Sequence, residues 1–98
     1  MTASAGETLA PEGALTFESL PSVLSQAEAF AARSDLPARL DIDFSRVTEV
    51  DSAALALLLE WRRVAARRGT QLTFLNLPPN LVALATLYGI EQLVQPAA

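Results

Sequence analysis

The sequence predicts a single α/β domain in which a mixed β-sheet packs against helices. Segments with apolar residues at three-and-four spacing, typical of amphipathic helices, alternate with short segments in which apolar and polar residues alternate, typical of strands. The expected order is strand-strand-helix-strand-helix-strand-helix, which implies right-handed crossover connections. With 98 residues, of which 51% are hydrophobic, the chain can form one hydrophobic core but not two.

The N-terminal part of the chain predicts a short β-hairpin. Residues 1–6 are small and polar and are expected to be frayed, so the folded domain should extend over residues 7–96. Segments 7–10 and 14–17 flank the turn-forming sequence Pro11-Glu12-Gly13. We therefore expect two adjacent strands joined by a tight turn.

Apolar periodicity predicts a first helix from Ser19 or Pro21 to Arg33. Proline suits the first turn of a helix, because the N–H that it lacks has no partner there. The apolar positions of this helix are Leu20, Val23, Leu24, Ala27, Phe30 and Ala31. A strand is expected after the break at 35–37, because Leu40, Ile42 and Phe44 alternate with Asp41 and Asp43.

The second half of the chain predicts two further helices and one strand. Residues 45–51 are expected to turn the chain into a helix over about 52–68, which Gly69 ends in the usual position past a helix C-terminus. A strand should follow over 70–75. Pro78-Pro79 then opens a third helix, closed by Gly89, with the apolar stripe Leu81, Leu84, Ala85 and Tyr88. Tyr88 could pack its ring inward with its hydroxyl at the edge of the hydrophobic core, or it could contact a partner.

Composition excludes several classes of function. The formal net charge of −4 disfavours nucleic-acid binding, which requires positive potential along the phosphate backbone. The chain has no His and no Cys, so a Ser-His-Asp relay, a Cys nucleophile and a zinc site of ordinary ligands are impossible. We therefore expect a protein that is not an enzyme and that holds no metal or cofactor.

The sequence also indicates a cytoplasmic protein. The N-terminus lacks the basic flank and the apolar core of a signal peptide. The longest uninterrupted apolar run, over 53–59, has seven residues, whereas a membrane-spanning helix needs about 20. No direct insertion into a membrane is expected.

The stretch 43–55 carries the functional signal. Taken alone, Asp51 or Ser52 can cap the following helix by accepting a hydrogen bond from a free backbone N–H, a contact worth about 1 kcal/mol. Alternatively, Ser52 faces solvent at a helix start, where the dipole favours an anion and where a partner or a kinase could reach the hydroxyl. Phosphorylation there would add about −1.5 to −2 charge.

Two elements of this stretch resemble the paired motif of the STAS domain, the fold of anti-sigma-factor antagonists and of the cytosolic tails of sulphate transporters. In that family an Asp-Leu-Ser at a strand end precedes a hydrophobic Asp-Ser/Thr-x-Gly-Leu. Here the elements are Asp43-Phe44-Ser45 and Asp51-Ser52-Ala53-Ala54-Leu55. Ala54 departs from the pattern, because family members often have Gly there. The basic-ended helix and the segment 84–90 are most similar to the MlaB-type subunit.

The resemblance implies a non-catalytic subunit that binds and stabilises or regulates the ATPase of a phospholipid-trafficking ABC transporter of the Mla type. Such a subunit is peripheral to the inner membrane through that partner. The alternative is an anti-sigma-factor antagonist switched by phosphorylation of Ser52. A third alternative, a hydrolase using Asp43 and Asp51, would need a pocket with a perturbed carboxylate; carboxylates at strand ends, Asp41 included, more often cap turns or face water.

A helical wheel divides the helix 52–68 into two faces. The face assigned to the core comprises Ala54, Leu57, Leu58, Trp61 and Ala65. The expected partner-binding residues are Ser52, Asp51, Ala53, Leu55, Ala56, Leu59, Arg63 and Arg67. Alternatively, Leu55 and Leu59 lie under a neighbouring loop and the arginines are merely solvated. Glu60 and Arg63 are expected to form an ordinary helix ion pair.

Overall fold

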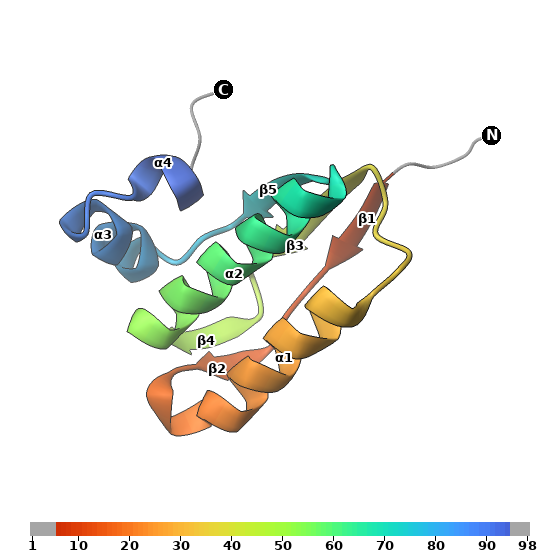
Figure 1. The fold of residues 1–98 in the computed structure, drawn as a ribbon. Coiled ribbons are helices and arrows are strands. Elements are labelled where there is room, and N and C mark those ends of the chain that lie inside the picture. The colour runs from red at the N-terminus through yellow and green to blue at the C-terminus, as the bar shows by residue number, and fades with distance from the viewer. Residues whose placement is uncertain (1–5, 95–98) are drawn as a thin grey trace.

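The computed structural model of the chain describes residues 6–94 (Figure 1). The strands are β1 (Gly6–Leu9), β2 (Gly13–Leu15), β3 (Arg39–Asp43), β4 (Val47–Val50) and β5 (Gln71–Leu75). The helices are a 3₁₀ helix, η1 (Phe17–Ser19), and α1 (Leu20–Ala32), α2 (Ser52–Arg68), α3 (Pro79–Leu87) and α4 (Glu91–Val94). The expectation of a frayed segment 1–6 lies outside the described residues except at Gly6, which begins β1.

The strands form two small sheets rather than one. Strands β1, β3 and β5 make a three-stranded sheet in the order β1-β3-β5, and β2 pairs with β4 in a second sheet. All three of these pairings run parallel, with Leu9 opposite Ile42 and Ile42 opposite Phe74 in the larger sheet. The α/β class is confirmed, whereas the antiparallel pair that the predicted hairpin would have contributed is absent from residues 6–94.

The predicted N-terminal hairpin is therefore wrong. The segment 10–12 forms no turn and carries the chain from one sheet into the other, and β1 and β2 each pair with a strand from later in the sequence. A two-stranded hairpin alone is marginally stable. Pairing of β2 with β4 instead places Leu15 in the core with 0% of its surface exposed.

Strand β4 and helix α4 were not predicted. Residues 47–50 were expected to be part of a turn, but Val47, Thr48 and Val50 are β-favouring side chains and pair with β2. Helix α4 has four residues, too few for a periodic pattern to show, yet it buries Val94. Both elements depend on contacts with distant parts of the chain.

The other helices agree with the prediction. Pro21 lies in the first turn of α1, and α2 spans the expected residues. Gly69 ends α2 with a left-handed φ of 72°, a conformation that glycine adopts without the cost of a Cβ. Helix α3 begins at Pro79, and Gly89 follows its end.

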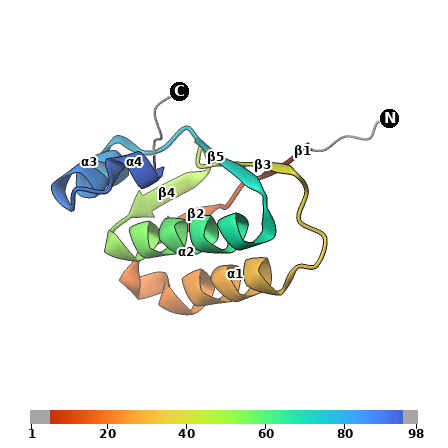
Figure 2. The same ribbon diagram turned by 45° about the horizontal axis from the view of Figure 1, so that its top comes forward.

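Helices α1 and α2 cover the strands from one side, and α3 and α4 lie at one end of the molecule (Figure 2). Helices α1 and α2 lie side by side, and α3 and α4 pack against α2 on the side away from α1. The predicted alternation in β3 is confirmed, since Leu40, Ile42 and Phe44 are each at most 1% exposed. The ring of Trp61 in α2 lies 6.1 Å from the ring of Phe44, centre to centre, and joins helix to sheet. Thus α2 is the central helix of the core.

Candidate docking site at the start of helix α2

The side chain of Asp51 forms the N-cap of α2. Its Oδ1 accepts a hydrogen bond from the backbone N–H of Ala53 at 2.8 Å, so Asp51 is the cap of the two side chains, Asp51 and Ser52, that the sequence allowed. Its Oδ2 accepts a second bond, from the backbone N–H of Phe17 at 3.0 Å. The carboxylate is therefore already engaged, and it attaches the 3₁₀ helix η1 to the beginning of α2.

Ser52 is the first residue of α2 and is half-buried. Within residues 6–94 its hydroxyl makes no hydrogen bond to another residue, because Asp51 supplies the cap. The first turn of α2 contains no acidic residue. The N-terminus of this 17-residue helix therefore offers a hydroxyl that is not used for capping, beside the carboxylate of Asp51, which already offsets part of the positive charge of the helix start.

The expected docking strip on α2 is corrected at two positions. Ala53 and Leu55 are only 3% and 4% exposed, and Leu55 belongs to the core cluster. The reason is that α2 has neighbours on two sides, α1 and the pair α3 and α4, in addition to the strands. The buried part of the α2 surface is consequently wider than the single apolar face that the helical wheel assigned to the core.

The remaining strip residues stay accessible to different degrees. Ala56, Arg63 and Arg67 are exposed, and Leu59 is half-buried. The residues assigned to the core are all buried, as predicted; they are Ala54, Leu57, Leu58, Trp61 and Ala65. The surface of α2 thus keeps a small apolar part near its start and a basic part near its end.

The arginines of α2 are not equivalent. Arg63 forms the predicted pair with Glu60, at 2.6 Å between Nη2 and Oε2, and this hydrogen-bonded contact raises the pKa of Arg63 and lowers that of Glu60. Arg68 instead donates to the backbone carbonyls of Ala31, at 2.7 Å, and Arg33. These are carbonyls at the end of α1, so Arg68 caps that helix and serves a structural role.

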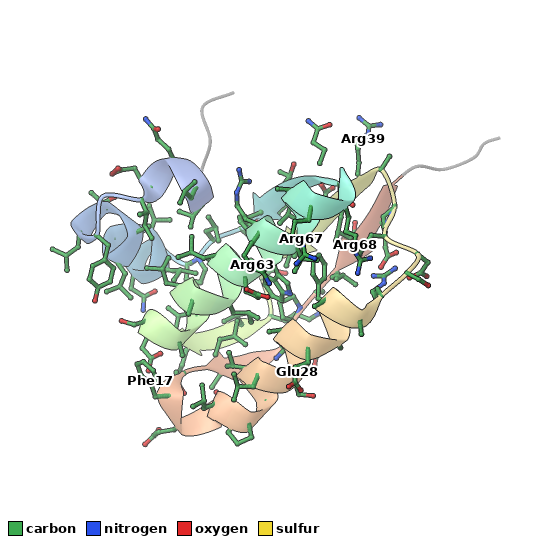
Figure 3. The ribbon with its side chains drawn as sticks, viewed as in Figure 1. Phe17, Glu28, Arg39, Arg63, Arg67 and Arg68 are labelled. Carbon is green, nitrogen blue, oxygen red and sulfur yellow. The ribbon has the colours of Figure 1, made fainter. Side chains whose placement is uncertain are left out.

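Figure 3 shows Phe17 at the end of the molecule where α2 begins, and Arg63 and Arg67 further along the helix. Ser52 and Arg67 are fifteen positions apart in α2, which corresponds to about 22 Å along the axis. The helix start and its basic end are therefore two separate surfaces. A single partner must be large to contact both.

An apolar groove between α1 and α2 was not predicted as a functional feature. It has a volume of about 410 Å³, and the helix-start residues Ala53 and Ala56 line it together with Phe17, Leu20 and Leu24. Phe17 and Leu24 are 62% and 54% exposed. The sequence signal was the broad apolar stripe of the first helix, of which only part is buried in the core.

The three aspartates do not gather into an acid-base site. Asp43 accepts hydrogen bonds at 2.9 Å from the side-chain amide of Asn76 and the backbone N–H of Ser45, and these contacts, chiefly that of Asn76, lower its pKa. Asp51 caps α2. Between residues 6 and 94 no cluster of three or more acidic, His or Cys side chains could hold a metal ion. Nor does that part of the chain contain a helix with the length and hydropathy for crossing a bilayer.

Tyr88 and Trp61 have opposite environments. Tyr88 is 56% exposed at the end of α3, so its ring is available to a partner. Trp61 is 3% exposed and contacts the rings of both Phe30 and Phe44, which confirms its place in the core.

A family model described as Mlab, STAS domain, matches residues 2–95. The chain belongs to this STAS family. The two segments that carry the resemblance in the sequence, Asp43-Phe44-Ser45 and Asp51-Ser52-Ala53-Ala54-Leu55, lie where β3 ends and where α2 begins. No match was found among functionally curated proteins.

Solved structures show the same fold at low sequence identity. A sulfate transporter family protein from Wolinella succinogenes is 17% identical with a TM-score of 0.68, over 96% of this chain and 79% of that one. The STAS domain of a SulP transporter from Vibrio cholerae is 17% identical with a TM-score of 0.69, over 96% and 71%. The anti-sigma factor antagonist SpoIIAA, in its unphosphorylated form, is 15% identical with a TM-score of 0.61, over 89% and 78%. The predicted STAS-type fold is confirmed.

Proposed function

We propose that this protein is a non-catalytic STAS subunit that binds the ATPase of a phospholipid-trafficking ABC transporter of the Mla type and stabilises or regulates it. The observation that carries the proposal is the family match over residues 2–95, whose description names the Mlab subgroup. The protein would act in the cytoplasm, held at the inner membrane through its partner. Any ATP hydrolysis would take place in the ATPase chain.

The proposed docking site is the start of α2 together with the adjoining apolar groove. Ser52 supplies a hydroxyl that makes no hydrogen bond to another residue within 6–94, beside the capping carboxylate of Asp51. Ala56 lies next to it and also lines the groove, where Phe17 and Leu24 expose large apolar surfaces. Exposed apolar side chains bordered by polar groups are typical of protein interfaces.

The basic end of α2 would contribute a second contact of lower energy. Arg67 is exposed and forms no ion pair within residues 6–94, so it can meet acidic residues of a partner, and Arg63 can do so in competition with Glu60. Exposed charges of this kind affect the association rate more than the affinity. Regulation requires that docking favour one conformation of the ATPase over another, because a partner shifts an equilibrium only by its differential affinity.

The proposal is tested by measuring binding of the purified transporter ATPase to immobilised wild-type protein and variants. We expect Ser52→Glu to weaken binding at least tenfold, because a longer, charged side chain would replace the hydroxyl and add a second negative charge beside the carboxylate of Asp51. Ser25→Glu is the matched control, since Ser25 lies on the exposed surface of α1 and does not line the groove. Equal binding by all three proteins would show that the docking site is elsewhere, and no binding by the wild type would refute the transporter role.

A second candidate function is that of an anti-sigma-factor antagonist switched by phosphorylation of Ser52. The specific observation in its favour is the Ser52 hydroxyl at the start of α2, which does not cap the helix and makes no hydrogen bond to another residue within 6–94. Mass spectrometry of the protein isolated from its native host tests this candidate. Phosphate on Ser52, together with recovery of a kinase-type partner that Ser52→Glu no longer binds, would support it over the transporter role.

A further inference from the structure

The docking groove is the apolar groove between α1 and α2. It follows α1 from Leu20 to Ala31, eleven positions that correspond to about 16 Å or three helical turns, and it follows α2 from Ala53 to Glu60. The two helices run in the same direction, because the start of α2 binds η1 through Asp51, just before α1, and the end of α2 binds the last turn of α1. The groove is therefore an elongated space with two distinct ends.

The groove stays open because many of the side chains that line it are small. A methyl group reaches only a short way from the backbone and leaves the space between the helices unfilled. The large side chains of Phe17 and Leu24 border this space and are 62% and 54% exposed, so a bound segment would cover them. Four of the lining residues are alanines, namely Ala27, Ala31, Ala53 and Ala56.

The charged side chains that line the groove are carboxylates. They are Glu28 of α1 and Glu60 of α2, and none of the described lining residues is basic. Glu60 already forms an ion pair within α2, whereas Glu28 is exposed and forms no ion pair within residues 6–94. Helices η1 and α1 contain no basic residue and one further acidic residue, Glu18. In Figure 3 Phe17 lies near the start of α1 and Glu28 further along it, so the groove has an aromatic end and an acidic end.

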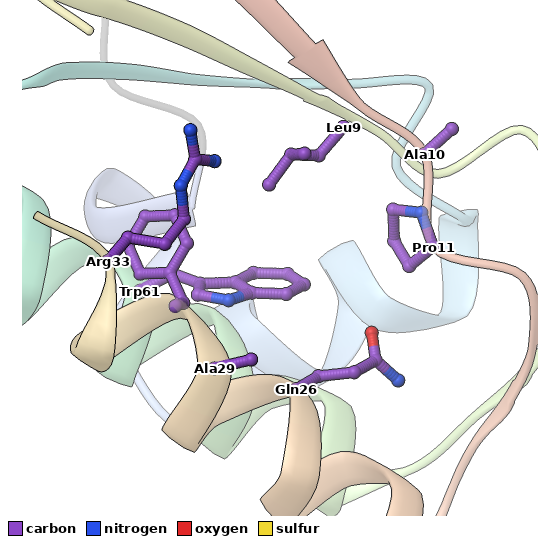
Figure 4. A pocket seen from close by; sticks show the side chains of 8 residues that line it. Leu9, Ala10, Pro11, Gln26, Ala29, Arg33 and Trp61 are labelled. Carbon is purple, nitrogen blue, oxygen red and sulfur yellow. The ribbon is translucent and has the colours of Figure 1, made fainter. Parts of the chain in front are cut away.

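A cavity of about 370 Å³ on another side of α1 offers no comparable preference (Figure 4). Arg33 is the charged residue of its lining, and its guanidinium already pairs with Glu7 at 2.8 Å and Asp35 at 3.0 Å. Trp61 also lines this cavity, but it is 3% exposed and presents little surface to a ligand. The charge of Glu28 therefore makes the docking groove the more selective of the two spaces.

We propose that the docking groove receives a basic amphipathic helix, and the assignment of this helix to the ATPase rests on the proposed function. An amphipathic helix lays apolar side chains at three-and-four spacing into a groove of this kind, and three turns correspond to about eleven residues. Its apolar side chains would cover Phe17 and Leu24. A Lys or Arg toward its other end would pair with the carboxylate of Glu28.

Two other occupants fit these charges less well. A second copy related by two-fold symmetry would bring the same surface, with its own Glu28, against the groove, and like charges oppose that contact. An anionic phospholipid would bring its phosphate group to the same acidic surface. A partner segment that is both apolar and positively charged matches the apolar and the acidic parts of the groove together.

The probe is a stapled helical peptide of about eleven residues, labelled with a neutral dye, with leucines on one face and lysines at one end. Fluorescence anisotropy measures its binding to the wild type, Glu28→Lys and Glu49→Lys. The last is the matched control, because it makes the same change of net charge at an exposed position of β4 outside the groove. We expect saturable binding to the wild type and to Glu49→Lys, and at least about fivefold weaker binding to Glu28→Lys.

A second peptide, with glutamates in place of the lysines, should reverse this order and bind Glu28→Lys most tightly. Equal affinity of the basic peptide for the two lysine variants would overturn the proposal, and so would a lack of saturable binding to the wild type. A dimer of the free protein that Leu24→Ala dissociates in sedimentation would overturn it as well, because a second copy would then occupy the groove.

Binding of the purified ATPase separates this inference from the proposed function. Ser52→Glu tests the proposed docking of the ATPase, and Glu28→Lys tests the helix in the groove, with Glu49→Lys as its control. If the ATPase binds the wild type and Glu28→Lys equally well, the transporter role stands and the helix assignment fails. If the ATPase does not bind the wild type while the basic peptide still discriminates between the two lysine variants, the proposed function fails and the preference of the groove for a basic helix stands.

Discussion

The carboxylate of Asp51 joins the start of α2 to the backbone of Phe17. One oxygen binds the N–H of Ala53 at 2.8 Å and the other binds the N–H of Phe17 at 3.0 Å. The cap of α2 and the position of an exposed aromatic ring in the docking groove therefore depend on one side chain. A substitution of Asp51 should therefore also alter the position of Phe17 in the groove.

Replacing Asp51 by Ala removes both hydrogen bonds. We expect the free energy of unfolding, measured with urea, to fall by about 1 kcal/mol, the usual effect of losing an N-cap. Asp51→Asn keeps an acceptor oxygen and a good capping side chain, so it should lose less. If Asp51→Ala is as stable as the wild type, the cap does not contribute to folding.

Leu55 tests the distinction between core and docking surface. Because it is 4% exposed, Leu55→Ala should cost about 3 kcal/mol of stability, as truncation of a buried leucine does. Leu24, at 54% exposure, is the matched control, and Leu24→Ala should change stability by less than about 1 kcal/mol while weakening partner binding. Equal losses of stability in urea unfolding would contradict this assignment.

Arg68 and Arg67 are neighbours with different roles. Arg68→Met removes the donors to the carbonyls of Ala31 and Arg33 at the end of α1, and we expect it to destabilise the protein by about 1 kcal/mol. Arg67→Met removes a solvated charge and should leave the unfolding temperature nearly unchanged. A larger effect of Arg67→Met would show that the structural assignment of the two side chains is reversed.

Glu7 gives the protein a pH-dependent contribution to stability. The hydrogen bonds from Arg33 lower the pKa of Glu7 below its ordinary value of 4.5. The stabilisation is therefore fully present above about pH 4.5 and is lost as the pH falls through the lower pKa of the folded state. Wild type and Glu7→Gln should differ near pH 7, by less than about 1 kcal/mol because the pair is partly exposed, and converge in acid.

The measurement for Glu7 is a series of urea unfolding curves between neutral and acidic pH. The control is Glu12→Gln, since Glu12 pairs with Arg46 at 3.1 Å with both side chains 67% exposed. Such an exposed pair should contribute almost nothing at any pH. A difference between wild type and Glu7→Gln that persists unchanged into acid would contradict the proposed origin.

Several features of the docking site were predictable from the sequence because they depend on local chemistry. Asp51-Ser52 before an apolar run predicts a cap from one of these two side chains, and glycine after a basic turn predicts the end of α2 at Gly69. The groove could not be predicted, because the degree to which Phe17 and Leu24 remain exposed depends on the position of α1 relative to α2. The burial of Leu55 likewise depends on the neighbours that α2 acquires from distant parts of the chain.

The sequence by itself determined helices α1, α2 and α3, the alternating strand β3 and the paired motif around Asp51, since each follows from side-chain periodicity or from one or two backbone groups. Only the tertiary structure decided how the strands pair. Residues 7–10 and 14–17 flank turn-forming residues, but β1 and β2 instead pair in parallel with β3 and β4, and Leu15 is fully buried in the core. Burial is a property of the assembled fold, and therefore local patterns could not decide which apolar side chains would stay on the surface.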